Sequence, residues 1–150
     1  IDDYLRKVKL DRMSNYPTSL PGIGPQDDFF NDHTMHPKDM EFECREVSSE
    51  MFVNYLEIVT SHAVEASIPG KSVKWLVYEK NTNKIVGFIR LGSPTINSKP
   101  RNMFLGKPLD TMNKEVMKRF NDSTIMGFAL VAVQPFGFNC LGGKLLAAIA

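Results

Sequence analysis

Residues 124–150 decide the fold, and their sequence is TIMGFALVAVQPFGFNCLGGKLLAAIA. Residues 125–133 are apolar except for Gly127, which predicts a central strand that is covered on both faces of a sheet. Pro135 has no backbone N–H and is expected to end this strand. A loop at residues 136–143, which carries three glycines, should follow, and strong helix formers from Lys144 onward predict a helix.

A helix that follows such a loop is a potential anion-binding site. Its first amides have no partner inside the helix, and the helix dipole adds partial positive charge at the same end. A pyrophosphate could therefore be held without side chains. A tight structural turn explains the same residues equally well. Two common phosphate motifs are absent, because Leu145 follows Lys144 where a P-loop has Ser or Thr, and no G-x-G-x-x-G occurs.

The segment resembles the corresponding part of the GNAT N-acyltransferases, in which a strand ending V-x-P precedes a loop [RQ]-x-x-G-x-[GA] and a leucine-bearing helix. Residues 133–135 (V-Q-P), Gly143 and Leu146 occupy the expected offsets. Phe138 stands where Arg or Gln is usual, and Leu141 where the first glycine is usual. The resemblance covers about residues 41–150 and implies an α/β fold with a mixed, mainly antiparallel sheet flanked by helices. It also implies acetyl-CoA or another acyl-CoA as cofactor.

This resemblance assigns roles to two sets of residues. The pantetheine arm would pair with the end of the central strand, at Val131 and Val133. The CoA pyrophosphate would bind the main-chain amides of the residues from the loop into the helix, which are Phe138, Asn139, Cys140, Leu141, Gly142, Gly143 and Lys144. The thiol of Cys140 is either a small apolar filler or a nucleophile.

No general base is evident for an amine that attacks the thioester. Glu79, Tyr55, Tyr78 and His62 are candidates only, so the catalytic residues stay unassigned. We expect no metal site, because His33 and His36 beside carboxylates in a loop are more often solvated than ligands.

Length and composition indicate one domain. The chain has 150 residues, 43% of them hydrophobic, and a formal net charge of +1. Two cysteines, with neither a signal peptide nor a membrane-length apolar run, favour a reduced, cytoplasmic setting without membrane association. The chain begins at Ile1 and stops at Ala150 within an apparent helix, so we expect it to be part of a longer protein. Its oligomeric state cannot be predicted.

The chain divides at about residue 40. Residues 1–40 form an arm with four prolines and a short helix expected at residues 2–13, and acidic residues are concentrated over residues 24–46. The core at residues 41–150 begins with a strand in which Phe42 and Cys44 face inward. A helix at 49–64 and a hairpin of strands 73–80 and 84–91 follow.

A basic insertion is expected at residues 92–123. A helix from Asp110 would bury Met112, Val116, Met117 and Phe120 on one face. Cations outnumber carboxylates in the insertion, at Lys99, Arg101, Lys107, Lys114, Lys118 and Arg119. These cations are either a solvated helix surface or contacts to the phosphates of DNA.

Residues 101–106 (R-N-M-F-L-G) and 121–131 (N-D-S-T-I-M-G-F-A-L-V) carry a second, weaker resemblance. They are similar to the phage-defence DruA-like proteins and to phage Mom-like DNA-modification proteins, which are themselves GNAT-related. The resemblances together imply an acyl-CoA-dependent N-acyltransferase domain of phage origin that acts on nucleic acid in the host cytoplasm. The alternative is a non-catalytic DNA-binding or virion-associated protein that retains the core for structure.

Overall fold

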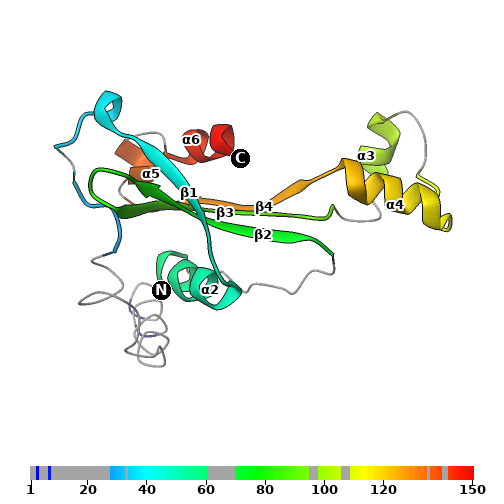
Figure 1. Cartoon of the computed structure of the whole chain (residues 1–150), viewed down its shortest axis with the longest axis horizontal. Coiled ribbons are helices and arrows are strands. Elements are labelled where there is room, and N and C mark those ends of the chain that lie inside the picture. Colours follow the sequence, from blue (N-terminus) through cyan, green and yellow to red (C-terminus); the bar gives the residue numbers. More distant parts are fainter. Residues whose placement is uncertain are drawn as a thin grey trace.

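A computed structural model describes Asp3, Lys7 and residues 28–32, 34–60, 70–94, 98–105, 109–134, 136–139 and 142–150. Four strands form one antiparallel sheet in the order β1-β2-β3-β4 (Figure 1). The strands are β1 (Phe42–Glu46), β2 (Ser72–Glu79), β3 (Lys84–Gly92) and β4 (Met126–Ala132). The predicted α/β class with a mainly antiparallel sheet is therefore confirmed.

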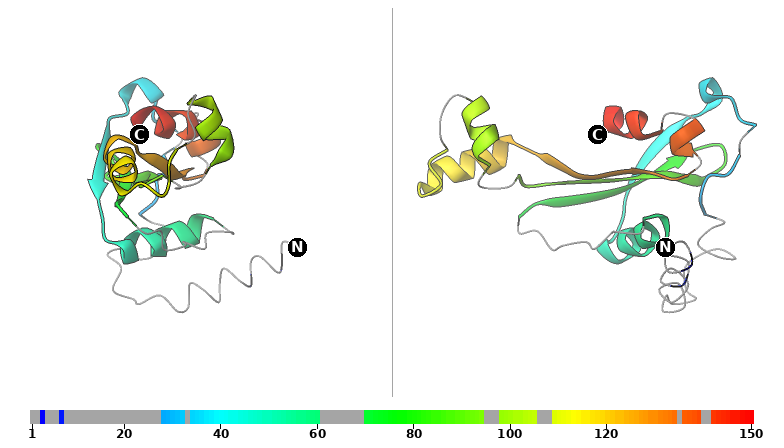
Figure 2. Two further views of the ribbon diagram at one scale, coloured as in Figure 1. Left: turned by 90° about the vertical axis from the view of Figure 1, so that its right-hand side faces the viewer. Right: turned by 180° about the vertical axis from the view of Figure 1, so that it is seen from behind.

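Helices cover both faces of the sheet and extend beyond one end of it. Figures 1 and 2 show α2 on one face, α5 and α6 on the opposite face, and α3 with α4 past the end of the sheet. The helical segments are η1 (Pro37–Asp39), α2 (Ser49–Val59), α3 (Lys99–Phe104), α4 (Lys114–Ser123), α5 (Phe136–Asn139) and α6 (Gly142–Ile149). No helix in the described ranges has the length and apolarity needed to cross a membrane.

Each face of the sheet has its own hydrophobic core. On the α2 face, Phe52 packs against Phe88 with ring centroids 5.7 Å apart, and Leu76 lies in the same cluster. On the α6 face, Leu146 and Phe136 pack with a second set of strand residues, which are Val77, Val86, Ile89 and Leu91. Because side chains alternate along a strand, Leu76 and Val77 enter different cores.

The apolar sequence of residues 125–133 predicts a central strand, but the structure places this strand, β4, at the edge of the sheet. β4 pairs only with β3 among the described strands, and Leu130 and Ile125 are exposed. The central position belongs to β3, in which every residue from Ile85 to Gly92 is buried. An apolar run thus does not distinguish a central strand from an edge strand whose outer side is open.

The hairpin is confirmed to within a residue at each strand end, and Asn83 adopts the positive φ (54°) that the turn requires. The helix expected at 49–64 ends earlier, at Val59. Thr60 takes an extended backbone, and both its N–H and its hydroxyl donate to the carbonyl oxygen of Leu56. Residues 61–64 lie outside the described ranges, as does the helix expected at 2–13 apart from Asp3 and Lys7.

Part of the expected arm belongs to the core. The Phe30 N–H donates to the Ile85 carbonyl at 2.9 Å, and the Ile85 N–H donates to the Asp28 carbonyl at 2.8 Å. Phe29 and Phe30 are both buried. Residues 28–30 therefore extend the sheet beside β3.

The sequence predicts that Cys44 faces inward, but the structure shows that it is exposed, because the α6-face core includes Phe42 of β1 and does not extend to Cys44.

Candidate functional site

The corner after β4 is built from two helices rather than the expected loop at 136–143. The Gly137 N–H donates to the Val133 carbonyl at 2.8 Å, so the chain enters α5 directly after the strand. The Phe136 ring is 2% exposed and packs edge-on against Phe30, with centroids 5.7 Å apart. The buried Phe136 ring fixes the start of α5 against the core. The next helix, α6, begins at Gly142, two residues before the predicted start.

The two adjacent glycines of α6 have different surroundings. A Cβ at Gly142 would lie 2.6 Å from atoms of the Phe136 ring, so Gly142 permits close packing of α6 on α5. Among the residues that the structure describes, a Cβ at Gly143 would meet nothing within 4 Å, and Gly143 and Lys144 are exposed. The described residues therefore leave the backbone at Gly143 uncovered in the first turn of α6, as a bound pyrophosphate would require.

The charge at this helix start also fits an anionic ligand. Lys144 lies in the first turn of α6, where the helix dipole disfavours a cation. The amides of Gly142, Gly143 and Lys144 have no acceptor within the helix, because the first amides of any α-helix lack one. An anion there would pair with the amides and the ammonium group together. Cys140 and Leu141 lie outside the described ranges, and Phe138 and Asn139 are within α5.

Val133 has no backbone group left for a ligand. Its N–H donates to the Val86 carbonyl at 3.0 Å, and its carbonyl accepts from Gly137. Val131 pairs with Phe88 and, two residues before Val133, directs its backbone groups to the same side. The intervening residue, Ala132, turns its backbone groups away from β3. Any extended ligand at this edge would pair with Ala132 instead of the two expected valines.

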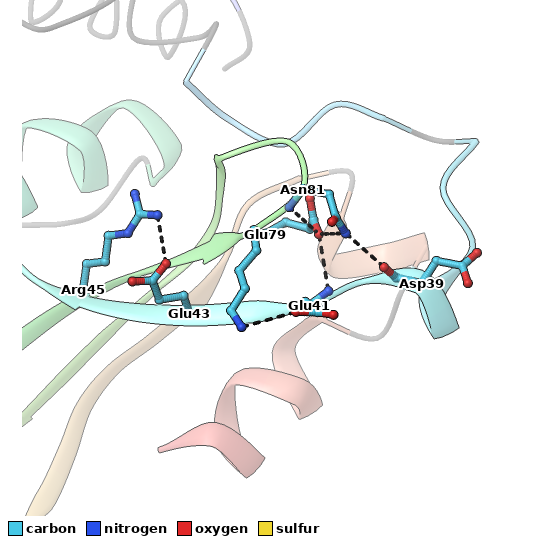
Figure 3. A network of polar contacts seen from close by, with 7 residues as sticks. Asp39, Glu41, Glu43, Arg45, Glu79 and Asn81 are labelled. Carbon is cyan, nitrogen blue, oxygen red and sulfur yellow. Dashed lines mark hydrogen bonds and ion pairs between the residues drawn. The ribbon is translucent and has the colours of Figure 1, made fainter.

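The carboxylate of Glu79, a candidate base, accepts several hydrogen bonds that hold the hairpin turn (Figure 3). This carboxylate is 0% exposed and accepts the N–H of Thr82 at 2.7 Å. It also accepts the N–H of Asn81 at 3.1 Å. It also accepts the Glu41 N–H at 3.3 Å, which ties β1 to the β2–β3 turn. The side chains of Thr82 and Asn81 donate to it as well.

The protonation of Glu79 follows from these contacts. Burial alone would raise the pKa of its carboxyl, but the hydrogen bonds from Thr82, Asn81 and Glu41 outweigh burial and hold the pKa below its usual value. An ionised carboxylate with several bound donors is a poor proton acceptor at neutral pH. Glu79 is therefore a structural residue of the hairpin.

The other candidate bases are also constrained. The Tyr55 hydroxyl donates to Asp28 Oδ2 at 2.7 Å, and burial together with this hydrogen bond raises the pKa of Tyr55 well above its usual range. Burial raises the pKa of Tyr78 too, although the Arg45 guanidinium, 4.3 Å from the Tyr78 ring centroid, opposes this. His62 and His33 lie outside the described ranges. His36 caps η1, where its Nδ1 accepts the N–H of Lys38.

The basic insertion forms a unit of α3 and α4, which we call the helical module (residues 98–105 and 109–124). Arg101 is half-buried, with its guanidinium carbon 4.7 Å from the Phe120 ring centroid. Its Nε and one terminal nitrogen donate to Asn102 Oδ1. Arg101 thus joins α3 to α4, while Lys107 lies outside the described ranges.

The remaining cations of the module are free to meet an anion. No hydrogen bond or ion pair links them to any part of the chain that the structure describes, and all four are exposed: Lys99, Lys114, Lys118 and Arg119. Lys114 and Lys118 are four residues apart on α4 and so share one helix face. The Asp122 carboxylate contacts the Lys71 ammonium group at 3.4 Å instead.

The spacing of Met112 predicts a place on the buried face of a helix, and this prediction is wrong. Asn113 caps α4 by accepting the N–H groups of Glu115 and Val116, so the helix begins at Lys114 and Met112 precedes it with 91% exposure. The Asn113 cap could have been recognised from sequence, because Asn is a preferred N-cap residue. The predicted inward positions Val116 and Phe120 are half-buried.

Three further exposed apolar residues were not predicted. Met103, Phe104 and Leu105 end α3 and are 71%, 89% and 60% exposed. Their spacing gives no signal for exposure, because three consecutive apolar residues are equally compatible with a buried segment.

Comparison with protein families gives a match over most of the chain. The family described as Druantia protein DruA matches residues 12–150. No curated protein and no solved structure matches the chain.

Proposed function

The chain belongs to the DruA family, and we propose that it serves in phage defence as an acyl-CoA-dependent N-acyltransferase-like domain that acts on nucleic acid. This proposal joins two parts of the molecule, the start of α6 and the helical module. Each part has its own support and its own test.

The observation that carries the acyl-CoA proposal is the open first turn of α6. The space that a Cβ at Gly143 would occupy has no neighbour within 4 Å in the described part of the chain, and the exposed Lys144 follows it. The amides of Gly143 and Lys144 would hold the CoA pyrophosphate, and the Lys144 ammonium group would neutralise part of its charge. Acyl-CoA would supply an activated thioester. The free edge of β4 at Ala132 lies beside this corner and could pair with the pantetheine amides.

Nucleic acid is the proposed partner of the helical module. Its exposed cations at Lys99, Lys114, Lys118 and Arg119 have no partner in the described ranges, and clustered cations supply sequence-independent attraction to phosphates. β4 joins the module to the corner over seven residues, which corresponds to roughly 23 Å. A duplex would need about seven base pairs to span that distance.

Acetyl-CoA binding tests the first part. Isothermal calorimetry and thermal unfolding with millimolar acetyl-CoA should show heat and a raised Tm, because a ligand that binds only the folded state stabilises it. Gly143→Asp should remove both effects. A carboxylate at this position suits the helix dipole, so the fold is retained, but it repels the pyrophosphate.

A charge-matched pair of variants locates the site. Lys144→Glu should weaken acetyl-CoA binding. Lys114→Glu makes the same change in net charge in α4, which lies past the far end of the sheet, and should leave acetyl-CoA binding unchanged. Wild-type protein that gives neither heat nor a Tm shift would refute the acyl-CoA proposal.

A second function, nucleic-acid binding without catalysis, is favoured by the state of the candidate bases. Glu79 is ionised and saturated with donors, and the Tyr55 hydroxyl is bound to Asp28. If DNA binds while acetyl-CoA does not, this second function replaces the first.

A further inference from the structure

The end of α3 carries exposed apolar side chains close to a cation on the same helix. These apolar residues, which we call the apolar tip, are Met103, Phe104 and Leu105. Phe104 is 89% exposed, so its ring faces are open to solvent. Large exposed apolar side chains that lie close in sequence mark interaction sites more often than isolated ones do.

One exposed cation lies on the same helix as the apolar tip, and others lie on α4 of the same module. Lys99 precedes Met103 by one helical turn and so lies on the same side of α3. Lys114 begins α4, the other helix of the module. Both lysines are exposed, and neither forms an ion pair with a residue in the described ranges. An occupant of the tip therefore meets open apolar surface and the unneutralised charge of Lys99 on the same helix.

We propose that the apolar tip is a base-stacking surface for single-stranded nucleic acid, with Phe104 stacking on an unpaired base and Lys99 of the same helix contacting a nearby phosphate. Proteins that bind single strands combine these two elements, since every base has a stacking face and every linkage a charge. In a duplex the bases are already stacked inside the helix, so the Phe104 ring gains no partner. This inference rests on the proposed nucleic-acid role of the module and specifies the form of its ligand.

Two other kinds of occupant fit the tip less well. Lysine is depleted from protein interfaces, yet here Lys99 lies on the same side of α3 as Met103. Interfacial membrane helices present one long apolar face. α3 has only six residues, and the apolar residues of α4, Val116, Met117 and Phe120, are half-buried rather than displayed.

Fluorescence anisotropy with labelled oligonucleotides tests the inference. A mixed-sequence strand of about 20 nucleotides exceeds the usual site of about 4–16 nucleotides, and the same strand annealed to its complement is the duplex probe. The wild-type chain should bind the single strand more tightly. Phe104→Ala should weaken single-strand binding by about 5- to 150-fold and change duplex binding less than about twofold.

Conservative variants separate stacking from general hydrophobic contact. Phe104→Trp should retain single-strand affinity, because a larger ring stacks at least as well, whereas Phe104→Leu should lose it. Ile125→Ala is the control, since Ile125 is 65% exposed but lies at the start of β4, outside the tip. It should bind like wild type.

Each contrary outcome has its own meaning. Equal affinity for both probes, unaffected by Phe104→Ala, would overturn the single-strand inference and leave the nucleic-acid proposal standing. Absence of binding to either probe at low salt would overturn both. Retained binding in Phe104→Leu would also overturn stacking, and tighter association with anionic phospholipid vesicles than with the single strand would identify a membrane surface instead.

Discussion

Leu146 of α6 lies directly over Gly87 of β3, so that a Cβ at Gly87 would be 2.4 Å from Leu146 Cδ1. Leu146 is 0% exposed, and this contact sets how closely α6 approaches the sheet. Glycine is thus required at position 87 because Leu146 fills the space of a side chain, and not because of the backbone conformation. The start of α6, where we propose that the cofactor binds, depends on the same contact for its position.

Replacing both Gly87 and Leu146 should destabilise the fold by less than the sum of the two single replacements. Gly87→Ala should lower the free energy of unfolding by about 1–3 kcal/mol through overpacking. Leu146→Ala should lower it by about 2–5 kcal/mol through cavity formation. In the double variant the new methyl group enters the vacated space, so the combined loss should fall below the sum of the two, as measured by urea unfolding. Simple additivity would show that the two side chains do not compete for the same volume.

Gly142 and Gly143, although adjacent, should respond oppositely to alanine. Gly142→Ala places a methyl group 2.6 Å from the Phe136 ring, which should destabilise the fold by about 1–3 kcal/mol. Gly143→Ala meets no neighbour among the described residues and should stabilise α6 by about 0.5–1 kcal/mol, because alanine favours helix. Thermal unfolding of the two variants measures the difference. Equal losses would mean that Gly143 is packed as tightly as Gly142.

Features set by neighbouring residues could be predicted from the sequence. The hairpin follows from a period of two and from turn residues that tolerate positive φ, and Asn83 takes that conformation. The start of α2 follows from Ser48, whose hydroxyl accepts the Met51 N–H. The early end of α2 at Val59 and the start of α4 at Lys114 depend on single backbone and capping choices, which apolar spacing does not resolve.

Features set by distant residues could not be predicted. Strand order makes β4 an edge and β3 central, yet both are apolar, and only tertiary pairing distinguishes them. The same holds for Phe29, whose place beside Ile85 is a contact between residues far apart in sequence. At the candidate site, composition indicated the cations, but the role of Arg101 against Phe120 required the packing of α3 on α4.

Glu79 should make stability depend on pH. Its folded-state pKa lies below the ordinary value, so its contribution is present above the unfolded pKa of about 4.3 and is lost as pH falls through the folded pKa. Glu79→Gln should lower the free energy of unfolding by about 2–3 kcal/mol at pH 7, because an amide group would face bound donors. The variant should also lose less stability than wild type between pH 7 and pH 3 in urea unfolding.

Glu41→Gln provides the matched control for Glu79. The Glu41 carboxylate lies 3.3 Å from the Lys80 ammonium group, and the side chains of Glu41 and Lys80 are 67% and 49% exposed, respectively. Such pairs contribute about 0–1 kcal/mol, so Glu41→Gln should unfold much as wild type does. If both variants showed the same pH dependence, the Glu79 carboxylate would not be the group that titrates.

Arg101 should act as a packing residue of the helical module, in contrast to Lys99. Its guanidinium lies over the Phe120 ring, a contact that contributes about 0.5–2 kcal/mol. Arg101→Ala should therefore speed amide hydrogen exchange across α3 and α4, because their association weakens locally. Lys99→Ala, which removes an exposed cation, should leave exchange unchanged and lower the slope of log K against log salt for duplex DNA by about 0.9. If Arg101→Ala instead reduced that slope with no change in exchange, Arg101 would be a phosphate contact, and another interaction would have to hold α3 against α4.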